Sequence, residues 1–306
     1  MNEVKFSLFS DLHHYPGVFR SNTPENLFKI QERAKENHVD FIIHCGDLTH
    51  VPAKEREFLS LYNDFEIPSY HCLGNHDTDG TPLAEVLALY KMPHMWYHFD
   101  VKGFRFIVLD TNYLYHEGEY LHFDCGNYYP HGGERDWMPP EELDYLRDTL
   151  ESAEGPCVLF NHSSFERCDG VQNRDAVRKV INDANEKHHN RVLLSINGHF
   201  HRDALTILDN VAYFEINSAS YDWVEKAHDK YPPEECAKIS LLNHTVCYND
   251  PVHAIVTMRE DGEISIEGMK STMLYGINRE HTENAVYDRM GRPVVPKVSD
   301  YHFRLL

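Results

Sequence analysis

The sequence predicts an α/β fold, and three observations carry that prediction. Short apolar runs alternate with helical patterns along most of the chain, which is the order of elements in α/β proteins. Hydrophobic residues make up 42% and charged residues 25%, as in a soluble globular protein. No run approaches the roughly 18 consecutive apolar residues of a spanning helix, so a membrane protein is not expected.

The first elements form a repeating β-α-β pattern. An apolar run from Val4 to Phe9 predicts a strand. Thr23-Pro24 predicts a helix start, because Thr suits the N-cap and Pro the first helical position. A second strand is expected over Val39 to Cys45, and the pattern then repeats with a helix within 52–65 and a strand within 67–73.

The later elements follow from the same patterns. Two hairpins are expected, 96–101 with 104–109 around Lys102-Gly103, and 254–258 with 264–266 around Asp261-Gly262. The remaining expected elements are a helix over 139–151, a strand over 157–160, a helix over 176–188, and strands over 192–196, 205–208 and 211–216.

Two segments interrupt this alternation. Residues 111–139 predict an aromatic-rich loop, far longer than the usual connection of about 2–6 residues. Such an insert is either a lid over a site or a segment packed on itself. Residues 271–306 lack periodicity and are interpreted as a tail on the domain or on a partner subunit. No linker or repeat precedes residue 270, so residues 1–270 are expected to form one domain.

Charge and cysteine usage restrict the partners and the compartment. The formal charge is 29 basic minus 49 acidic residues, or −20, which argues against a long nucleic acid as a partner. The seven cysteines are scattered and never form a C-x-x-C pair, so neither a disulfide framework nor a zinc knuckle is expected. With no signal-peptide pattern at the N-terminus, we expect a cytoplasmic protein, and a homo-oligomer stays open.

Polar clusters directly follow five of the predicted strands. In open α/β sheets, ligands bind in the crevice outside the carboxyl ends of the strands. Carboxylate, amide and imidazole together suit borderline divalent metals such as Mn, Fe or Zn, and 22 histidines among 306 residues need such an explanation. The clusters are Asp11-Leu12-His13, Gly46-Asp47, Gly74-Asn75-His76-Asp77, Asn161-His162 and Gly198-His199-Phe200-His201.

The spacing of these clusters suggests how they act together. In an extended Asp-x-His segment both side chains point to the same side, so Asp11 and His13 are expected to share one metal, and His199 and His201 have the same spacing. The two oxygens of Asp47 could bridge two cations about 3.5–4 Å apart.

In this order, the motifs D-x-H, G-D, G-N-H-D, H and G-H-x-H resemble those of the calcineurin-like metallophosphoesterase superfamily. The resemblance covers residues 11–201. It implies a four-layer α/β/β/α sandwich with two mixed β-sheets, and two divalent metal ions (Mn, Fe or Zn) at the carboxyl ends of the strands. It further implies one metal on Asp11, His13 and His201, a second on Asn75, His162 and His199, and Asp47 as the bridge.

The resemblance also implies a mechanism. A hydroxide between the metals would attack phosphorus in line, and His76 would contact the phosphate and protonate the leaving oxygen. Asp77 is expected to orient the His76 imidazole. Purple acid phosphatases carry a tyrosine ligand where this chain has His50, which argues against their iron site.

The segment spacing is more similar to the bacterial branch that includes cyclic-nucleotide phosphodiesterases. We therefore expect a hydrolase acting on a small, nucleotide-like phosphodiester. A phosphomonoesterase or nucleotide pyrophosphatase with the same metal core is the alternative. A hypothesis outside the enzymes is a non-catalytic scaffold, and the intact set of ligand positions argues against it.

Overall fold

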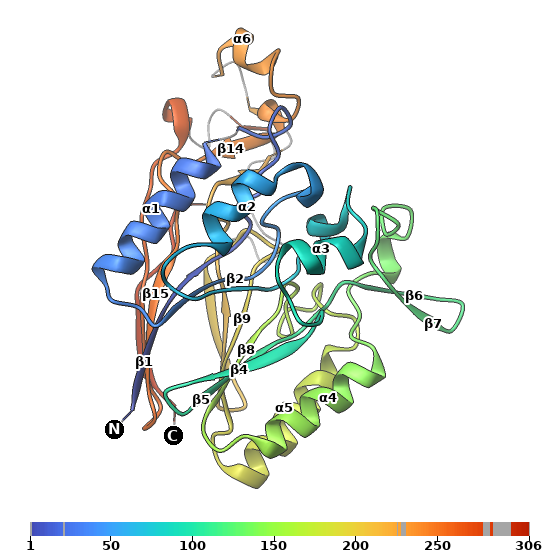
Figure 1. Cartoon of the computed structure of the whole chain (residues 1–306), viewed down its shortest axis with the longest axis vertical. Coiled ribbons are helices and arrows are strands. Elements are labelled where there is room, and N and C mark those ends of the chain that lie inside the picture. Colours follow the sequence, from blue (N-terminus) through green and yellow to red (C-terminus); the bar gives the residue numbers. More distant parts are fainter. Residues whose placement is uncertain are drawn as a thin grey trace.

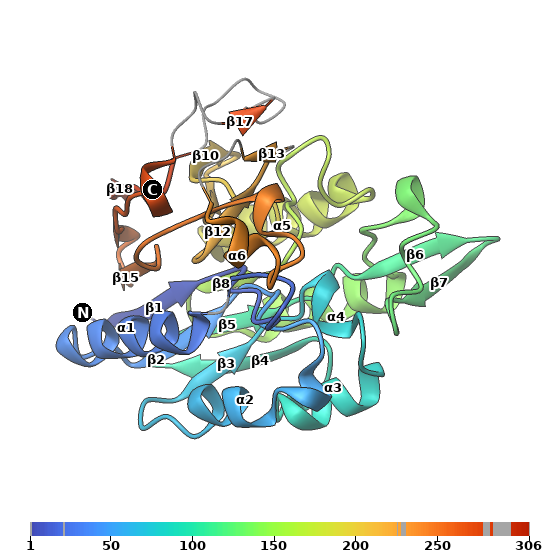
Figure 2. The same ribbon diagram turned by 90° about the horizontal axis from the view of Figure 1, so that it is seen from above.

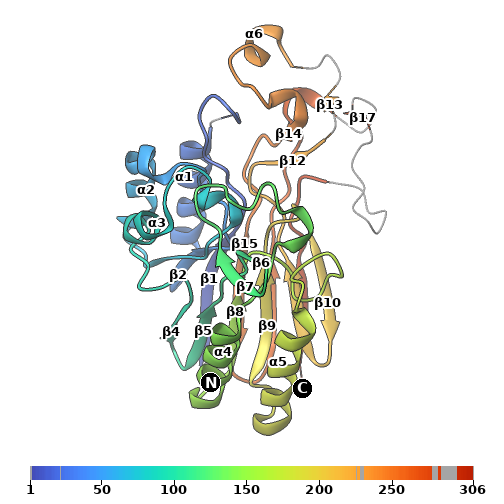
Figure 3. The same ribbon diagram turned by 90° about the vertical axis from the view of Figure 1, so that its right-hand side faces the viewer.

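Two six-stranded sheets pack face to face in the computed structural model, which describes residues 2–20, 22–224, 226–227, 231–277, 282–283 and 295–305. Helices cover the outer face of each sheet (Figures 1 and 3). The chain is therefore a four-layer α/β/β/α sandwich, as the motifs implied. Among the described residues, no helix has the length and apolar character needed to cross a bilayer.

The first sheet has three parallel strands in sequence order and three antiparallel strands from the end of the chain. Its strands, in spatial order, are β18 (Tyr301–Arg304), β16 (Glu263–Glu267), β15 (Ala254–Arg259), β1 (Glu3–Phe9), β2 (Phe41–His44) and β3 (Ser69–His71). Strand β1 pairs with β2 in parallel and with β15 in antiparallel, so the sheet is mixed.

The second sheet repeats this design with parallel strands at its centre. Its strands, in spatial order, are β10 (Ala204–Leu208), β11 (Val211–Glu215), β9 (Val192–Asn197), β8 (Cys157–Phe160), β5 (Phe104–Val108) and β4 (Tyr97–Val101). The edge strands β4 and β10 are antiparallel to their neighbours. In both sheets, the parallel strands direct their carboxyl ends to the same edge.

Burial of apolar side chains explains the layers. Between the sheets lie Phe6 and Phe41, whose rings stack at 5.0 Å, together with Phe106 and Phe160. The helices over the first sheet are α1 (Thr23–Glu36), α2 (Arg56–Asn63) and α3 (Leu83–Leu89), and those over the second sheet are α4 (Pro140–Ser152) and α5 (Arg174–His188). Each turns a stripe of apolar residues toward its sheet.

A smaller apolar cluster lies at the end of the molecule opposite the termini (Figure 3). We call this part the cap. It contains β12 (Tyr221–Trp223), α6 (Pro233–Cys236) and β14 (Thr245–Cys247). The cap packs against Phe19 from the loop after β1. Two further strands, β13 (Lys226–Ala227) and β17 (Thr282–Glu283), pair with each other.

Most predicted elements are confirmed, and the differences have identifiable causes. The N-cap of α1 is Asn22 rather than Thr23, whose hydroxyl oxygen lies 2.5 Å from His14 Nδ1. The interpretation of 111–139 as a loop was wrong in part, because β6 (Tyr113–His116) and β7 (Glu119–His122) form a hairpin that projects from the body (Figure 2). Its turn residues Glu117 and Gly118 both have positive φ, but the sequence lacks the usual Asn-Gly signal.

The predicted tail of residues 271–306 lies partly outside the described residues. Where it is described, β18 pairs with β16 at the edge of the first sheet. Val298 and Leu305 are buried in the core between the sheets. The domain boundary at residue 270 stays a prediction.

Candidate metal centre

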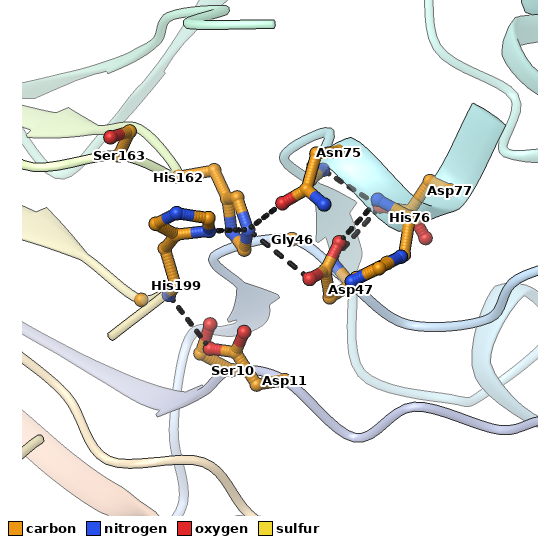
Figure 4. A network of polar contacts seen from close by, with 12 residues as sticks. Ser10, Asp11, Gly46, Asp47, Asn75, His76, Asp77, His162, Ser163 and His199 are labelled. Atoms are coloured by element: carbon orange, nitrogen blue, oxygen red, sulfur yellow. Dashed lines mark hydrogen bonds and ion pairs between the residues drawn. The ribbon is translucent and has the colours of Figure 1, made fainter. Parts of the chain in front are cut away.

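The loops that follow β1, β2, β3, β8 and β9 converge at one edge of the paired sheets (Figure 4). All seven residues predicted as metal ligands lie on these loops. They form two groups of potential donors, and within each group the donor atoms lie within 4.8 Å of one another. The first group is Asp11, His13 and His201, and the second is Asp47, His162 and His199, with Asn75 beside it.

In the first group a carboxylate oxygen faces two imidazoles. Asp11 Oδ1 lies 3.4 Å from His201 Nε2 and 3.7 Å from His13 Nε2. The two imidazole nitrogens are 3.2 Å apart. Asp11 Oδ1 is buried and has no hydrogen-bond partner. A buried oxygen without a partner needs an explanation, and a divalent cation fits this set of donors.

In the second group the donors surround His162. Its Nε2 lies 3.2 Å from Asp47 Oδ2 and 3.2 Å from Asn75 Oδ1. His199 Nδ1 lies 3.2 Å from the same nitrogen. The Asn75 amide nitrogen donates to the Tyr128 hydroxyl at 3.1 Å, which leaves the amide oxygen toward the group. This set of oxygen and nitrogen donors also fits a divalent cation.

Asp47 belongs to the second group and also faces the first. Its Oδ2 is 3.2 Å from His162 Nε2 and 3.8 Å from His13 Nε2. Its Oδ1 accepts a hydrogen bond from the His76 backbone N–H at 2.8 Å. One oxygen of Asp47 therefore faces both groups, while the other is held by the backbone.

The backbone of this centre departs from the expected extended form. Five of the seven residues have positive φ: Asp11 (52°), His13 (51°), Asp47 (53°), His199 (70°) and His201 (50°). The expectation that an extended Asp-x-His segment aligns its side chains was therefore wrong. The pairs meet because left-handed residues turn the chain. A left-handed backbone conformation costs a non-glycine residue about 1–3 kcal/mol, and it persists only where the surrounding structure stabilises it.

Close packing holds these turns. The N–H of Asp11 donates to the Gly46 carbonyl at 3.1 Å, and the N–H of His13 to the Asp47 carbonyl at 2.9 Å. Gly46 has φ of 96°, and a Cβ there would lie 2.4 Å from His162 Nδ1. A Cβ on Gly74 would lie 2.2 Å from Asp47 Oδ1. Both positions accept only glycine.

The protonation states favour cation binding. Burial alone would raise the pKa of the Asp11 carboxyl, but the nearby imidazoles of His13 and His201 hold that pKa well below its usual range. Burial lowers the pKa of His13 and His199 to about 3, so both imidazoles are neutral near pH 7. Burial opposes a charge on His162, yet Asp47 raises its pKa to about 10. The carboxylates thus favour a positive charge on His162, and a metal cation that binds its Nε2 would displace that proton, because metals bind ionised carboxylates and neutral imidazoles.

His76 lies beside the centre and is held by Asp79. His76 Nδ1 is 2.7 Å from Asp79 Oδ2. Burial lowers the pKa of His76, but the carboxylates of Asp47 and Asp79 raise it above its usual value overall. The hydroxyls of Tyr128 and Tyr129, from the insert, donate to Asp79 at 2.6 and 2.8 Å. Asp79 therefore joins the insert to His76.

Asp77 has a different position from the one expected. Its carboxylate accepts backbone N–H groups of Gly74 at 2.8 Å and Asp47 at 3.0 Å. It also accepts the N–H groups of Leu48 and Thr49 at 3.0 and 3.2 Å. The expected contact of Asp77 with the His76 ring was wrong, because the carboxylate turns toward the backbone of the loop after β2. It supports the loop that carries Asp47.

Sequence reasoning missed Asp79 and assigned no role to His50. His50 Nε2 lies 2.9 Å from His13 Nδ1, and its ring stacks on His76 at 4.4 Å. The available signal was spacing, because Asp79 follows His76 by three residues at the end of a 3₁₀ turn, Asn75–Thr78.

Comparisons with known proteins identify a matching family and similar folds. Residues 4–203 match the family model described as calcineurin-like phosphoesterase. No curated protein matches the chain significantly. A dimetal phosphatase from Danio rerio is similar in structure, with a TM-score of 0.62 and 14% identity over 90% of this chain and 99% of that one. GAP50, the anchor in the inner membrane complex of Plasmodium, has a TM-score of 0.54 and 16% identity over 100% of this chain and 89% of that one. At these identities the two structures show a shared fold.

Proposed function

The chain belongs to the calcineurin-like phosphoesterase family, which implies a dinuclear divalent metal site, and from this we propose that it hydrolyses a small, nucleotide-like phosphodiester. The observation that carries the proposal is the position of Asp47 Oδ2, which faces the donors of both groups at 3.2 and 3.8 Å. A single oxygen placed in this way can hold two cations close together.

We propose the following assignment of the ligands. Asp11, His13 and His201 hold one cation; Asn75, His162 and His199 hold the other; Asp47 bridges. The cations are Mn, Fe or Zn, for which this mixture of imidazole and oxygen donors is suited. Two such cations would lower the pKa of a shared water and neutralise the negative charge that develops on the phosphoryl oxygens.

His76 is proposed as the general acid. Its Nδ1 is engaged by Asp79, which leaves Nε2 to donate a proton to the leaving oxygen. The raised pKa of His76 favours the protonated form near neutral pH. Asp79 acts as a positioning residue for this ring. Asp77, expected at first as a catalytic residue, instead stabilises the loop that carries Asp47 by accepting a hydrogen bond from the Asp47 backbone N–H.

The alternatives share the same donors. A phosphomonoesterase or a nucleotide pyrophosphatase would use the same seven ligands, so the metal core does not separate them. A non-catalytic scaffold is the third hypothesis. The similarity to the Plasmodium protein shows that this fold also occurs in a protein described as an anchor. The converging donors in this chain support an enzyme.

The decisive experiment compares two substrates. We would measure kcat/KM of the Mn-loaded protein on bis-p-nitrophenyl phosphate and on p-nitrophenyl phosphate, with Asp47→Asn as the blank. A preference for the diester is expected. A preference for the monoester would favour the alternative, a phosphomonoesterase or nucleotide pyrophosphatase. Hydrolysis of neither ester after Mn or Fe supply would favour the non-catalytic scaffold. The cytoplasmic location stays a prediction, and a homo-oligomer stays open.

A further inference from the structure

A cavity of about 470 Å³ opens beside His76 and Asp79. Small-molecule sites have volumes of roughly 300–1,000 Å³, so this cavity has the size of a binding site. It contacts the candidate metal centre through His76 and His50, and its outer walls include Tyr15, Phe19, Tyr129 and Trp223. Tyr129 belongs to the insert that the sequence left open as a lid or a self-packed segment, and the other three were assigned no role from the sequence.

Aromatic rings form its walls. Tyr15 stacks on His50 at 4.9 Å and 20°, and His50 stacks on His76 at 4.4 Å and 29°. These rings form a continuous column that ends at the proposed general acid. Trp223 and Tyr129 are 41% and 58% exposed, which leaves broad aromatic surface available to a ligand.

The charged groups that line the cavity restrict which ligands it can bind. None of the described residues that line it is Lys or Arg. Its charged groups are His76 and Asp79, which are already paired at 2.7 Å. A ligand group that carried a second phosphate would meet the Asp79 carboxylate there and no Lys or Arg side chain, since the His76 imidazole is already paired with Asp79, and desolvating an unpaired phosphate is costly.

We propose that this cavity receives the leaving half of the substrate, and that this half is a flat aromatic group without a second phosphate. The inference rests on the proposed phosphodiesterase function. In the reaction, a water molecule releases one proton to the solvent as its oxygen bonds to phosphorus, the bond from phosphorus to the leaving oxygen breaks, and the proton of His76 passes to that oxygen. His76 then regains a proton from the solvent. The group therefore departs as a neutral alcohol, which suits an apolar cavity.

The first test compares leaving groups. Mn-loaded protein would be assayed on methyl 2-naphthyl phosphate and on the same ester with a sulfonate on the distal ring. We expect kcat/KM to be at least about tenfold higher for the ester without the sulfonate, because the sulfonate finds no Lys or Arg side chain in the cavity. Trp223→Ala should lower kcat/KM for the naphthyl ester about tenfold, mainly through KM.

Matched variants separate the contribution of the cavity from general effects of a substitution on the protein. Tyr115, also an exposed aromatic residue of the insert, does not line the cavity, so Tyr115→Ala should leave the preference unchanged. Tyr129→Phe keeps the ring but removes its hydrogen bond to Asp79, whereas Tyr129→Ala removes both. Only Tyr129→Ala should weaken the preference for the naphthyl ester.

A binding measurement is independent of turnover. Calorimetric titration with 2-naphthol should show binding to the wild type and to Tyr115→Ala, and about tenfold weaker binding to Trp223→Ala. If the enzyme is active but discriminates neither esters nor variants, this inference is wrong and the proposed function stands. If no phosphoester is hydrolysed after metal supply, the proposed function fails and the leaving-group assignment fails with it.

Discussion

His76 Nδ1 lies 2.7 Å from Asp79 Oδ2, and this contact connects the proposed general acid to the rest of the molecule. The two residues are three apart in the chain. The same carboxylate accepts the hydroxyls of Tyr128 and Tyr129, so the insert and the 3₁₀ turn after β3 hold one side chain together. The geometry makes Asp79 the residue that orients the ring and adjusts its proton affinity.

Replacing Asp79 should therefore alter the pH profile. In Asp79→Asn the carboxylate that raises the pKa of His76 is lost, so that pKa falls. Because the acid form of His76 is required, the alkaline limb of kcat should move to lower pH, with kcat about 10–100-fold lower. Metal content should stay unchanged. An unaltered pH profile would contradict the role of Asp79, and Asp64→Asn, at an exposed ion pair with Lys91, is the control.

Asp47→Asn should lose the metal pair. The charge of the oxygen that faces both donor groups disappears in this variant. We expect metal analysis of the Mn-loaded protein to fall from two ions per chain to one or none, together with loss of activity. Retention of two ions with full activity would refute the bridging assignment.

His76→Ala should keep both metals and lower kcat. The decrease should be largest for substrates with poor leaving groups, because these need protonation most. The measurement is kcat over a series of aryl diesters with increasing leaving-group pKa. An equal loss for all esters would argue against a general acid.

Asp77→Ala should destabilise the fold as a whole. Its carboxylate is fully buried and accepts four backbone N–H groups, which would lose their partner in the variant. Unsatisfied buried donors cost about 1–3 kcal/mol each, so we expect the free energy of unfolding to drop by about 3 kcal/mol or more. Denaturant unfolding measures this, with the exposed Asp64→Ala as control. A change below about 0.5 kcal/mol would show that the loop does not depend on Asp77.

His253 should make stability depend on pH. Burial lowers its pKa to about 3 in the folded protein, against a usual value of 6.5. At pH values between about 3 and 6.5, the His253 side chain binds a proton in the unfolded chain but not in the folded one. The free energy of unfolding therefore falls as pH decreases below about 6.5, and this group contributes about 1.4 kcal/mol per pH unit. Unfolding curves between pH 7 and 5 should show a smaller decrease for His253→Asn. Parallel decreases in both proteins would contradict this.

Parts of the fold were predictable because local patterns determine them. The runs around β1, β8 and β9 are apolar enough to be recognised as buried strands, and the Lys102-Gly103 turn identifies the β4–β5 hairpin. Strand β18 alternates aromatic and polar residues over only four positions, a run too short to be recognised, and both β18 and the cap are stabilised by partners distant in the chain. The β6–β7 hairpin was hidden because its strands are also only four residues long and its Glu-Gly turn is unusual.

For the candidate site, the sequence by itself determined which residues lie at strand ends. Asp11 and Asp47 follow neighbouring parallel strands of one sheet, which direct their carboxyl ends to one edge, so these two residues had to converge. His162 follows β8 in the second sheet, so its place beside them depends on how the two sheets pack. Only the tertiary structure decided which atoms face which. It turned Asp77 toward the backbone and Asp79 toward His76, because a hydrogen-bond partner depends on where a turn directs a short side chain. It also formed the aromatic cavity from segments that are separated by up to about three quarters of the chain. Such a cavity depends on packing between distant loops, and no local pattern in the sequence encodes that packing.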